Sequence, residues 1–250
     1  MSGPYELSIV LPAFNEEANI ERAMDHATEV AERLCGRHEI VVVDDGSIDH
    51  TAELVTLRCG HDPRVRLVRH DLNRGYGEAL RTGFEAAALD LVFFTDADNQ
   101  FDLNELEAFL PWIEHVDVVA GFRRNRQDPP MRRLAAKGWN ALVRVLFHAP
   151  VRDIDCAFKL FRRSLFAELD LVAVGAMVNT ELMVRLGRSG KGVIEIGVTH
   201  FPRTAGEARG AHPKVVATAF VELVRMYRRL KIAGAQDARV PRPPPGPRPR

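Results

Sequence analysis

Short apolar runs alternate with helical segments along the first half of the sequence. The runs are Leu7–Leu11, Ile40–Val43, Val65–Val68, Leu91–Thr95 and Val116–Ala120. Apolar runs of this length, bounded by polar residues, are typical of buried strands. The segments between them predict helices, at about 15–34, 51–58, 76–87 and 104–114. Strands that alternate with helices form βαβ units, so the sequence predicts an α/β fold with a mostly parallel, doubly wound, Rossmann-like sheet flanked by helices.

The pattern changes after Gly121. The second half predicts helices at Met131–Phe147, Thr180–Arg188 and Lys214–Lys231, and strands at Asp153–Phe161 and Gly192–Val198. The first and last of these helices are amphipathic, with apolar stripes and basic flanks. Pro and Arg dominate from about residue 233, so a disordered tail is expected over 233–250. We expect one domain over 1–232, with halves at about 5–121 and 122–232.

The composition excludes several classes of protein. Lys+Arg and Asp+Glu are equal at 34 each, so no overall positive field attracts nucleic acid, and no nucleic-acid partner is expected. The three cysteines lie far apart, which fits a reducing compartment and argues against a disulfide framework or a zinc site. No leader precedes the first predicted strand, and no apolar run approaches the ~18 residues of a membrane span. These features predict a cytoplasmic chain that would meet a membrane only from its surface.

Two aspartates follow the run Leu91–Thr95, in the triplet Asp96-Ala97-Asp98. Open α/β sheets bind ligands outside the carboxyl ends of their strands, so both aspartates are expected at that edge. Two carboxylates, with Asn99 and Gln100 next in the chain, suit Mg²⁺ or Mn²⁺, which usually takes one or two carboxylates and fills its shell with phosphate oxygens. The alternative is that Asp98 only caps a turn, because Asp-x-Asp triplets are common.

Two other predicted strand ends carry polar residues. One continues as Asp44-Asp45-Gly46-Ser47 and the other as Pro12-Ala13-Phe14-Asn15-Glu16. A doubly wound sheet would bring these ends to the same edge as Asp96 and Asp98. Such an edge suits a nucleotide, with acids for ribose hydroxyls and base donors and a metal ion for the diphosphate. A glycine-rich phosphate loop is absent from the sequence, so the ion would have to neutralise the diphosphate.

Four motifs occur in a fixed order: Pro12–Glu16, Asp44-Asp45-Gly46-Ser47-x-Asp49-x-Thr51, Asn73-x-Gly75-x-Gly77-x-Ala79 and Asp96-Ala97-Asp98-x-Gln100. In this order they resemble the family 2 inverting glycosyltransferases, which have the GT-A fold. Within that family the chain resembles the polyprenyl-phosphate branch, of the dolichol-phosphate-mannose-synthase type. The additional matches are Arg133-x3-Lys137-x2-Asn140, Asp153–Arg162, Glu181 and Arg203-x2-Gly206. The resemblance covers roughly residues 7–210.

The resemblance implies a role for each matching position. Nucleotide-sugar binding would fall to Pro12, Ala13, Phe14, Glu16, Asp44, Asp45, Gly46, Ser47, Gly75, Asp96 and Ala97. The Mg²⁺ or Mn²⁺ ion would be held by Asp96, Asp98 and Gln100. Acceptor or donor phosphates would be held by Arg123, Arg133, Arg203 and Arg209, since the planar guanidinium binds phosphate oxygens bidentately. The catalytic residues would be Asp98, Asp153 and Arg203.

The implied reaction is a metal-dependent, inverting transfer of a hexose from a nucleotide-diphosphate sugar, of the GDP-mannose or UDP-glucose type, to polyprenyl phosphate. A lipid monophosphate has an anionic oxygen near neutral pH, because its second pKa is ~6, so a strong general base is not required. Asp153 would be the base if the acceptor were a hydroxyl, and otherwise makes a structural hydrogen bond or orients an arginine. Departures from the family pattern at Lys137, Ala157, Phe101-Asp102 and Ala208-Arg209 leave the sugar open.

Other functions are compatible with parts of the sequence. A glycosyltransferase with a soluble or protein acceptor would use the same donor motifs, but the arginine set and the segment Asp153–Arg162 argue against it. A receiver-type signalling module also has paired aspartates at a strand end, but it is about half this length. A catalytically silent nucleotide-binding relative is the remaining alternative. Divalent-ion-dependent binding of a nucleoside diphosphate separates the receiver from the others.

The amphipathic helices predicted at Met131–Phe147 and Lys214–Lys231 have two interpretations. They either pack in the ordinary way against the core or lie at a membrane surface, where basic amphipathic helices bind anionic headgroups. A polyprenyl tail has to stay in the bilayer while its phosphate reaches the site. The second interpretation therefore predicts a peripheral protein on the inner face of the membrane, and it leaves room for a membrane partner protein.

Overall fold

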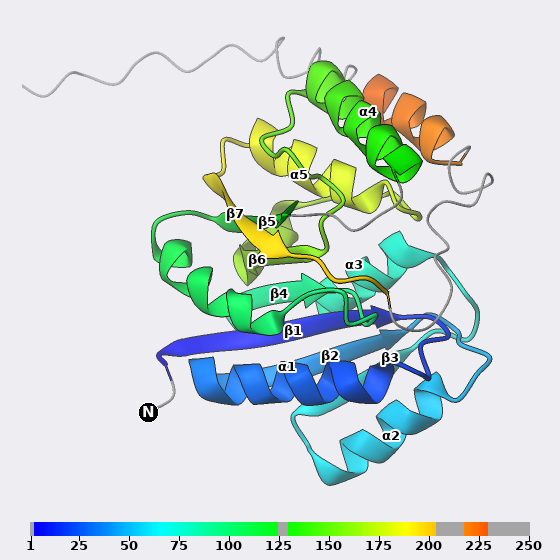
Figure 1. Ribbon diagram of the computed structural model, residues 1–250, viewed down its shortest axis with the longest axis vertical. Helices are drawn as coiled ribbons and strands as arrows, with labels where there is room; N and C mark the ends of the chain where they lie inside the picture. Colours follow the sequence, from blue (N-terminus) through cyan, green and yellow to red (C-terminus); the bar gives the residue numbers. More distant parts are fainter. Residues whose placement is uncertain (1–2, 125–129, 204–217, 230–250) are drawn as a thin grey trace, which may run out of the picture.

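The computed structural model describes residues 3–124, 130–203 and 218–229. Within them, seven strands form one sheet in the order β3-β2-β1-β4-β6-β5-β7 (Figure 1). β6 runs antiparallel to β4 and β5, and the other neighbours pair in parallel. This confirms the predicted mostly parallel α/β sheet. The strands are β1 (Tyr5–Ala13), β2 (Cys35–Asp44), β3 (Val65–Arg69), β4 (Leu91–Thr95), β5 (Val118–Arg124), β6 (Phe158–Arg162) and β7 (Val193–Thr199).

Helices connect and cover the strands. They are α1 (Ile20–Leu34), α2 (Thr51–His61), α3 (Tyr76–Ala86), α4 (Pro130–Phe147) and α5 (Val178–Arg188), and a further helical segment spans 218–229. Figure 1 shows α4 and the segment 218–229 side by side at one end of the molecule, away from α1 and α2. Ring contacts join α4 to this segment, between Trp139 and Phe220 and between Phe147 and Tyr227. The second half of the chain therefore adds a helical layer, made of α4 and the segment 218–229, beyond the sheet.

The central strands are buried on both faces. Every residue of β4 is buried, and β1 and β2 are buried over their carboxyl-terminal parts. Strands covered on both faces lack polar alternation, which is why these runs are continuously apolar. Gly83 of α3 lets the helix approach the sheet, because a Cβ there would lie 2.3 Å from Val10 Cγ1. Close packing of α3 fixes the strand ends that lie beside its first turn.

Two predicted elements differ from the structure. Residues 104–114 form two 3₁₀ helices, η1 (Leu103–Ala108) and η2 (Leu110–Glu114), rather than one helix. Pro111 in the first turn of η2 has no N–H to continue an α-helical ladder from η1. The strand predicted over Asp153–Phe161 begins only at Phe158, and Cys156 N donates to Asp153 O in a turn before it. A third 3₁₀ helix, η3 (Arg163–Glu168), follows β6.

Some predictions fall on other parts of the chain. The predicted helix Lys214–Lys231 is observed over 218–229, and its remaining residues lie outside the described part. The predicted tail 233–250, Arg209 and most of the loop after Arg203 also lie outside it. No helix among the described residues is long and apolar enough to cross a membrane.

Candidate donor and metal site

The carboxyl ends of β1, β2 and β4 meet at one edge of the sheet, as predicted. Ala13 at the end of β1 is in register with Asp44 at the end of β2, and Asp45 N donates to Ala13 O at 2.9 Å. β4 pairs with the other side of β1 and delivers Asp96 and Asp98 to the same edge. The side chains of Pro12, Ala13 and Ala97 are buried in the wall of this edge. Their predicted contacts with a nucleotide sugar stay predictions.

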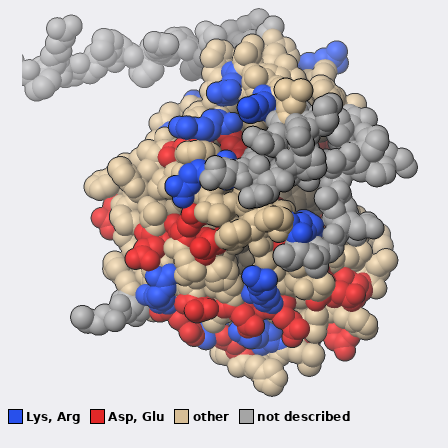
Figure 2. Space-filling view, in the orientation of Figure 1, with Lys and Arg blue, Asp and Glu red and all other residues tan. Residues whose placement is uncertain are grey.

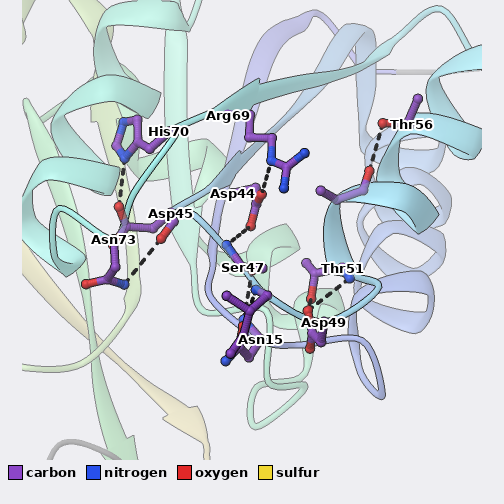
Figure 3. A network of polar contacts seen from close by, with 12 residues as sticks. Asn15, Asp44, Asp45, Ser47, Asp49, Thr51, Thr56, Arg69, His70 and Asn73 are labelled. Carbon is purple, nitrogen blue, oxygen red and sulfur yellow. Dashed lines mark hydrogen bonds and ion pairs between the residues drawn. The ribbon is translucent and has the colours of Figure 1, made fainter.

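Asp44 organises the turn after β2 (Figure 3). Its fully buried carboxylate accepts a hydrogen bond from Ser47 N at 3.0 Å and pairs with Arg69 Nε at 3.1 Å. Ser47 Oγ in turn accepts from Asn15 N at 2.9 Å, and Asn15 Oδ1 accepts from Ile48 N at 2.9 Å. The turns after β1 and β2 are thus held together by reciprocal bonds.

Asp45 is directed into the next loop. Its buried carboxylate lies 2.7 Å from His70 Nδ1 and accepts from Arg74 N at 2.9 Å and Gly75 N at 2.8 Å. Gly75 has φ +99°, a conformation that favours glycine, and a Cβ there would lie 2.7 Å from Val174 O. We therefore assign Asp45 a role in positioning the Gly75 turn. The prediction that it binds nucleotide directly stays a prediction.

Asp96 and Asp98 lie just beyond β4. Asp98 is 4% exposed, and its Oδ1 accepts from Gln100 N at 3.1 Å. Gln100 Nε2 donates to Phe201 O at 3.0 Å, which ties this turn to the strand end beyond β7. Asp96 Oδ1 accepts from the Tyr76 hydroxyl at 2.8 Å. The two carboxylates are thus held by different partners, Asp96 by the first residue of α3 and Asp98 by the turn after β4.

Burial disfavours the charged forms of Asp96 and Asp98. It raises the pKa of Asp96 to about 7, with the neighbouring Asp98 charge adding to the effect. Burial also raises the pKa of Asp98, against the opposing effect of Arg203. Arg203 Nη2 lies 2.5 Å from Asp98 Oδ2, and Arg203 Nη1 lies 3.4 Å from Glu16 Oε1. Arg203 therefore supplies positive charge beside this pair of carboxylates.

These residues fit a divalent ion that brings further ligands with it. Within the described residues, no group of three or more His, Cys, Asp and Glu side chains could hold a metal by itself. Two carboxylates and the Gln100 amide are hard oxygen ligands of the kind Mg²⁺ and Mn²⁺ prefer. Phosphate oxygens would have to complete the shell. The chemistry of the donor set thus agrees with an ion that binds together with a diphosphate.

A second polar centre lies on the side of β5. Arg123 N, Nε and Nη2 donate to the Asp153 carboxylate at 3.0, 2.8 and 2.6 Å. Both side chains are nearly buried. Burial acts to lower the pKa of Arg123, but the bonds to Asp153 outweigh it and raise that pKa. Asp153 is thus occupied in orienting an arginine, one of the alternatives that the sequence left open.

The structure brings together only part of the predicted arginine set. Arg203 lies beside Asp98 at the candidate metal site, and Arg123 pairs with Asp153. Arg133 lies in α4, but its side chain is outside the described part, as is all of Arg209. Glu181 is buried, and its Oε2 accepts from Val172 N and Ala173 N at 2.8 Å each. Glu181 is therefore neither a surface acid nor exposed to substrate, but holds the loop beside Gly75.

Sequence reasoning missed the side chain that contacts Asp96, the Tyr76 hydroxyl. Tyr76 lies between Gly75 and Gly77 in a matched motif, so that motif was the available signal. His70, the partner of Asp45, was also missed, because its contact depends on the register of β2 and β3.

Comparison with known proteins agrees with this geometry. Residues 8–170 match the sequence profile of the family described as Glycosyl transferase family 2. Glycosyltransferase AglD of Haloferax volcanii is 32% identical over 208 residues, which are 79% of this chain and 33% of that protein. An undecaprenyl-phosphate 4-deoxy-4-formamido-L-arabinose transferase of Pectobacterium carotovorum is 30% identical over 218 residues, 84% of this chain and 64% of that protein. The chain thus spans between a third and two thirds of the length of these relatives.

Solved structures share the fold at lower sequence identity. Glucosyl-3-phosphoglycerate synthase from Mycobacterium tuberculosis, in complex with Mn²⁺, UDP and phosphoglyceric acid, superposes with a TM-score of 0.68 and 23% identity, over 89% of this chain and 78% of that one. Mannosyl-3-phosphoglycerate synthase from Rubrobacter xylanophilus superposes with a TM-score of 0.69 and 20% identity, over 97% of this chain and 79% of that one. At this identity the likeness concerns the fold alone.

Proposed function

The chain belongs to glycosyl transferase family 2 and has the GT-A fold, and on this premise we propose that it transfers a sugar from a nucleotide-diphosphate donor to a polyprenyl phosphate. The observation that carries the proposal is the pair Asp96 and Asp98, with Arg203 across Asp98, at the sheet edge that also holds Asp44. The acceptor is suggested by relatives that are named undecaprenyl-phosphate sugar transferases. We propose that residues 1–232 act as one domain, with a donor half and an acceptor half.

The donor nucleotide would lie along the turns after β1 and β2. Arg69, whose half-exposed guanidinium is held by the buried carboxylate of Asp44, would contact a base or ribose, and the turn at Asn15, which is bonded to Ser47, would lie along the same edge. Asp96, Asp98 and Gln100 would hold Mg²⁺ or Mn²⁺ on the diphosphate. The bound ion would supply stabilisation of the negative charge that develops on the leaving nucleoside diphosphate. M. tuberculosis glucosyl-3-phosphoglycerate synthase was crystallised with Mn²⁺ and UDP, which supports a divalent ion for this fold.

The acceptor phosphate would be oriented by arginines. In an inverting transfer, an acceptor oxygen forms a bond to the anomeric carbon as the bond to the diphosphate oxygen breaks on the opposite side. An anionic phosphate oxygen carries no proton to remove, so the protein mainly has to hold two mutually repelling phosphates in line. Arg203 and Arg123 would do this work: Arg203 lies beside Asp98, and Asp153 fixes the guanidinium of Arg123 in one orientation. Arg133 and Arg209 remain proposed phosphate ligands.

We propose that the helical layer formed by α4 and the segment 218–229 faces a membrane surface, on its inner side. Leu134, Val145, Phe220, Val221 and Val224 are exposed apolar side chains of this layer. Exposed basic side chains accompany them at Lys137, Arg144, Arg225, Arg228 and Arg229. Figure 2 shows that the charged side chains over the upper part of the molecule are mostly Lys and Arg, whereas Asp and Glu mix with Lys and Arg over the lower part. This polarity would orient the acceptor half toward anionic headgroups. A membrane partner protein is not required by it.

The sugar is the least constrained part of the proposal. A hexose from a GDP-mannose or UDP-glucose type of donor is the prediction from the sequence, whereas the Pectobacterium relative is named for a formamido-arabinose. A soluble, phosphate-bearing acceptor is the second candidate, because two proteins with this fold are named for phosphoglycerate. Both candidates require the same arginine-lined acceptor side.

Release of nucleoside diphosphate tests the proposal. The protein would be mixed with Mn²⁺ and with GDP-mannose, UDP-glucose or UDP-4-deoxy-4-formamido-L-arabinose, each with undecaprenyl phosphate, with 3-phosphoglycerate or without acceptor. Release of GDP or UDP that requires undecaprenyl phosphate is expected with one donor. Release that requires 3-phosphoglycerate instead would replace the lipid acceptor by the soluble one. No acceptor-dependent release with any donor would contradict the proposal.

A further inference from the structure

A lysine side chain is buried in the middle of the sheet. Lys159 of β6 is fully buried and is in register with Phe94 of β4 and Ala120 of β5, and its Nζ lies 5.3 Å from the centre of the Phe94 ring. Asp96 follows Phe94 by two residues, and Arg123 follows Ala120 by three. Lysine is rarely fully buried, because its charge needs compensation away from water. A lysine at this position therefore indicates a specific task.

The Lys159 ammonium group holds a turn by its backbone. Its Nζ donates to Ile154 O at 3.1 Å and also to Cys156 O. Hydrogen bonds from a charged donor are stronger than those between neutral groups. Cys156 N donates to Asp153 O at 3.2 Å, which closes the turn itself. The turn 153–156 is thus fixed to β6 through Lys159.

Helix α4 holds the same turn through another backbone group. Asn140 is 8% exposed, and its Oδ1 accepts from Ile154 N at 3.0 Å. Its Nδ2 donates to Ala136 O, one helical turn earlier, also at 3.0 Å, so both ends of the amide are bonded. Ile154 is therefore held by its N–H from α4 and by its carbonyl from Lys159. Asn140 thus ties the turn to the layer that we propose faces the membrane.

The position of this turn sets the direction of an arginine. Arg123 N, Nε and Nη2 all donate to the carboxylate of Asp153, the first residue of the turn. The N–H groups of a guanidinium form a rigid, planar fork, so these bonds also fix where its remaining N–H groups point. A shift of the turn would carry Asp153 with it and turn the fork of Arg123.

We propose that Lys159 and Asn140 are positioning residues for the acceptor, which hold the turn 153–156 in the place from which Asp153 directs Arg123 at the acceptor phosphate. The inference rests on the proposed function, because it takes Arg123 as a phosphate ligand. Neither Lys159 nor Asn140 touches the acceptor in this arrangement, so their effect passes through Arg123. Misplacing a reacting group by about 1 Å can cost about 100-fold in rate.

Steady-state release of nucleoside diphosphate tests the proposal, with Mn²⁺ and with undecaprenyl phosphate and the active donor varied in turn. Lys159→Met removes the ammonium group and keeps an unbranched side chain, and Asn140→Ala removes the amide and suits a helix. We expect each to lower kcat/KM for undecaprenyl phosphate about 10- to 100-fold and to leave the KM for the donor unchanged. Lys191→Met is the matched control, since Lys191 pairs at 3.0 Å with Glu168, whose side chain is 64% exposed.

A third variant shows whether the effect passes through Arg123. Arg123→Lys keeps a positive charge beside Asp153 but loses the planar fork. In this background, Lys159→Met and Asn140→Ala should each add less than about threefold to the loss, because both act through the guanidinium. Full, additive losses would overturn the inference.

The outcomes separate this inference from the proposed function. Unchanged kcat/KM for undecaprenyl phosphate in Asn140→Ala or in folded Lys159→Met, with a loss in Arg123→Lys, would overturn the inference and leave the proposed function standing. A rise in the donor KM equal to that for the lipid would also overturn it, because it would indicate general damage. No lipid-dependent release by the unmodified protein would contradict the proposed function and this inference together. Thermal melting would identify a temperature at which each variant is folded, and Asn140→Ala carries the test if Lys159→Met does not fold.

Discussion

At the scale of single residues, Arg123 and Asp153 form a largely buried ion pair. Only 12% of the Arg123 side chain and 10% of the Asp153 side chain are exposed. Removing one member of such a pair leaves the other charge buried without compensation. The pair therefore matters to stability as well as to the orientation of Arg123, which we propose as a phosphate ligand.

We expect Asp153→Ala to lower the free energy of unfolding by about 3–5 kcal/mol. Urea unfolding would measure the loss. Glu107→Ala is the control, because Glu107 pairs with Arg33 and these side chains are 68% and 44% exposed, and such pairs contribute about 1 kcal/mol or less. A similar, small loss in both variants would contradict the assignment of Asp153 as the buried partner of Arg123.

At the scale of elements, the loop before α5 and the start of α3 are packed without spare room. A Cβ on Gly77 would lie 2.4 Å from Ala173 O, whereas a Cβ on Gly138 of α4 would have no atom within 4 Å. We expect Gly77→Ala to destabilise the protein by about 1–3 kcal/mol. Gly138→Ala should stabilise it by about 0.5–1 kcal/mol, because alanine favours a helix interior. Thermal melting measures both, and equal shifts would contradict the close contact.

Glu39 links four segments at the other end of the sheet. Its carboxylate accepts from Ser8 Oγ and Ala88 N at 2.7 Å each and from Arg66 Nη1 at 2.8 Å. Burial alone would raise the pKa of Glu39, but these bonds outweigh it and hold the pKa below its ordinary value of 4.5. A carboxyl whose pKa is lowered on folding stabilises the protein above the pKa of the unfolded chain, and this stabilisation is lost as the pH falls through the folded pKa.

We therefore expect Glu39→Gln to be less stable than the unmodified protein at pH 7, by about 1–3 kcal/mol. The difference should shrink as the pH falls below about 4, where Glu39 itself becomes protonated. Urea midpoints across this range would test it, with Asp25→Asn as a surface control. A difference that does not change with pH would show that the charge of Glu39 contributes nothing.

The same elements show how far sequence reasoning reaches. β4 has the predicted bounds, because a strand buried on both faces is a continuous apolar run. The error at Asp153–Phe161 arose because an apolar segment does not reveal that its first carboxylate binds an arginine 30 positions earlier. The aspartates at the strand ends were predictable, since topology alone brings them together. The contact of the Tyr76 hydroxyl with Asp96 was not, because it depends on how α3 packs.

At the scale of the whole molecule, two regions are separate. One is the sheet edge with Asp44, Asp96 and Asp98, and the other is the proposed membrane layer, formed by α4 and the segment 218–229. α4 and the segment 218–229 lie at one end, and α1 and α2 cover the other (Figure 1). Phe220 and Val224 are each 49% exposed on the membrane layer, and Leu57 of α2 is 58% exposed far from it. The proposal predicts that apolar side chains at these two places differ in their effect on lipid binding.

Sedimentation with anionic lipid vesicles would measure that difference. Val224→Glu and Phe220→Glu should each weaken binding about tenfold or more, because each removes an apolar contact worth ~1.5–3 kcal/mol. Leu57→Glu makes the same kind of change on the opposite end and should leave binding unaltered. Equal losses in all three variants would indicate nonspecific repulsion by the added acid and would count against a dedicated membrane face.

The measurement that tests the central claim most directly is transfer of labelled sugar into an organic phase. The donor identified by nucleotide release would be incubated with undecaprenyl phosphate, Mn²⁺ and either the unmodified protein, Asp98→Asn or Asp102→Asn. Asp102 is a nearby acid whose carboxylate accepts from Asn104 N, a bond that asparagine can keep. We predict labelled lipid with the unmodified protein and with Asp102→Asn, and a loss of about 10²–10³-fold with Asp98→Asn. Undiminished labelling by Asp98→Asn would contradict the account.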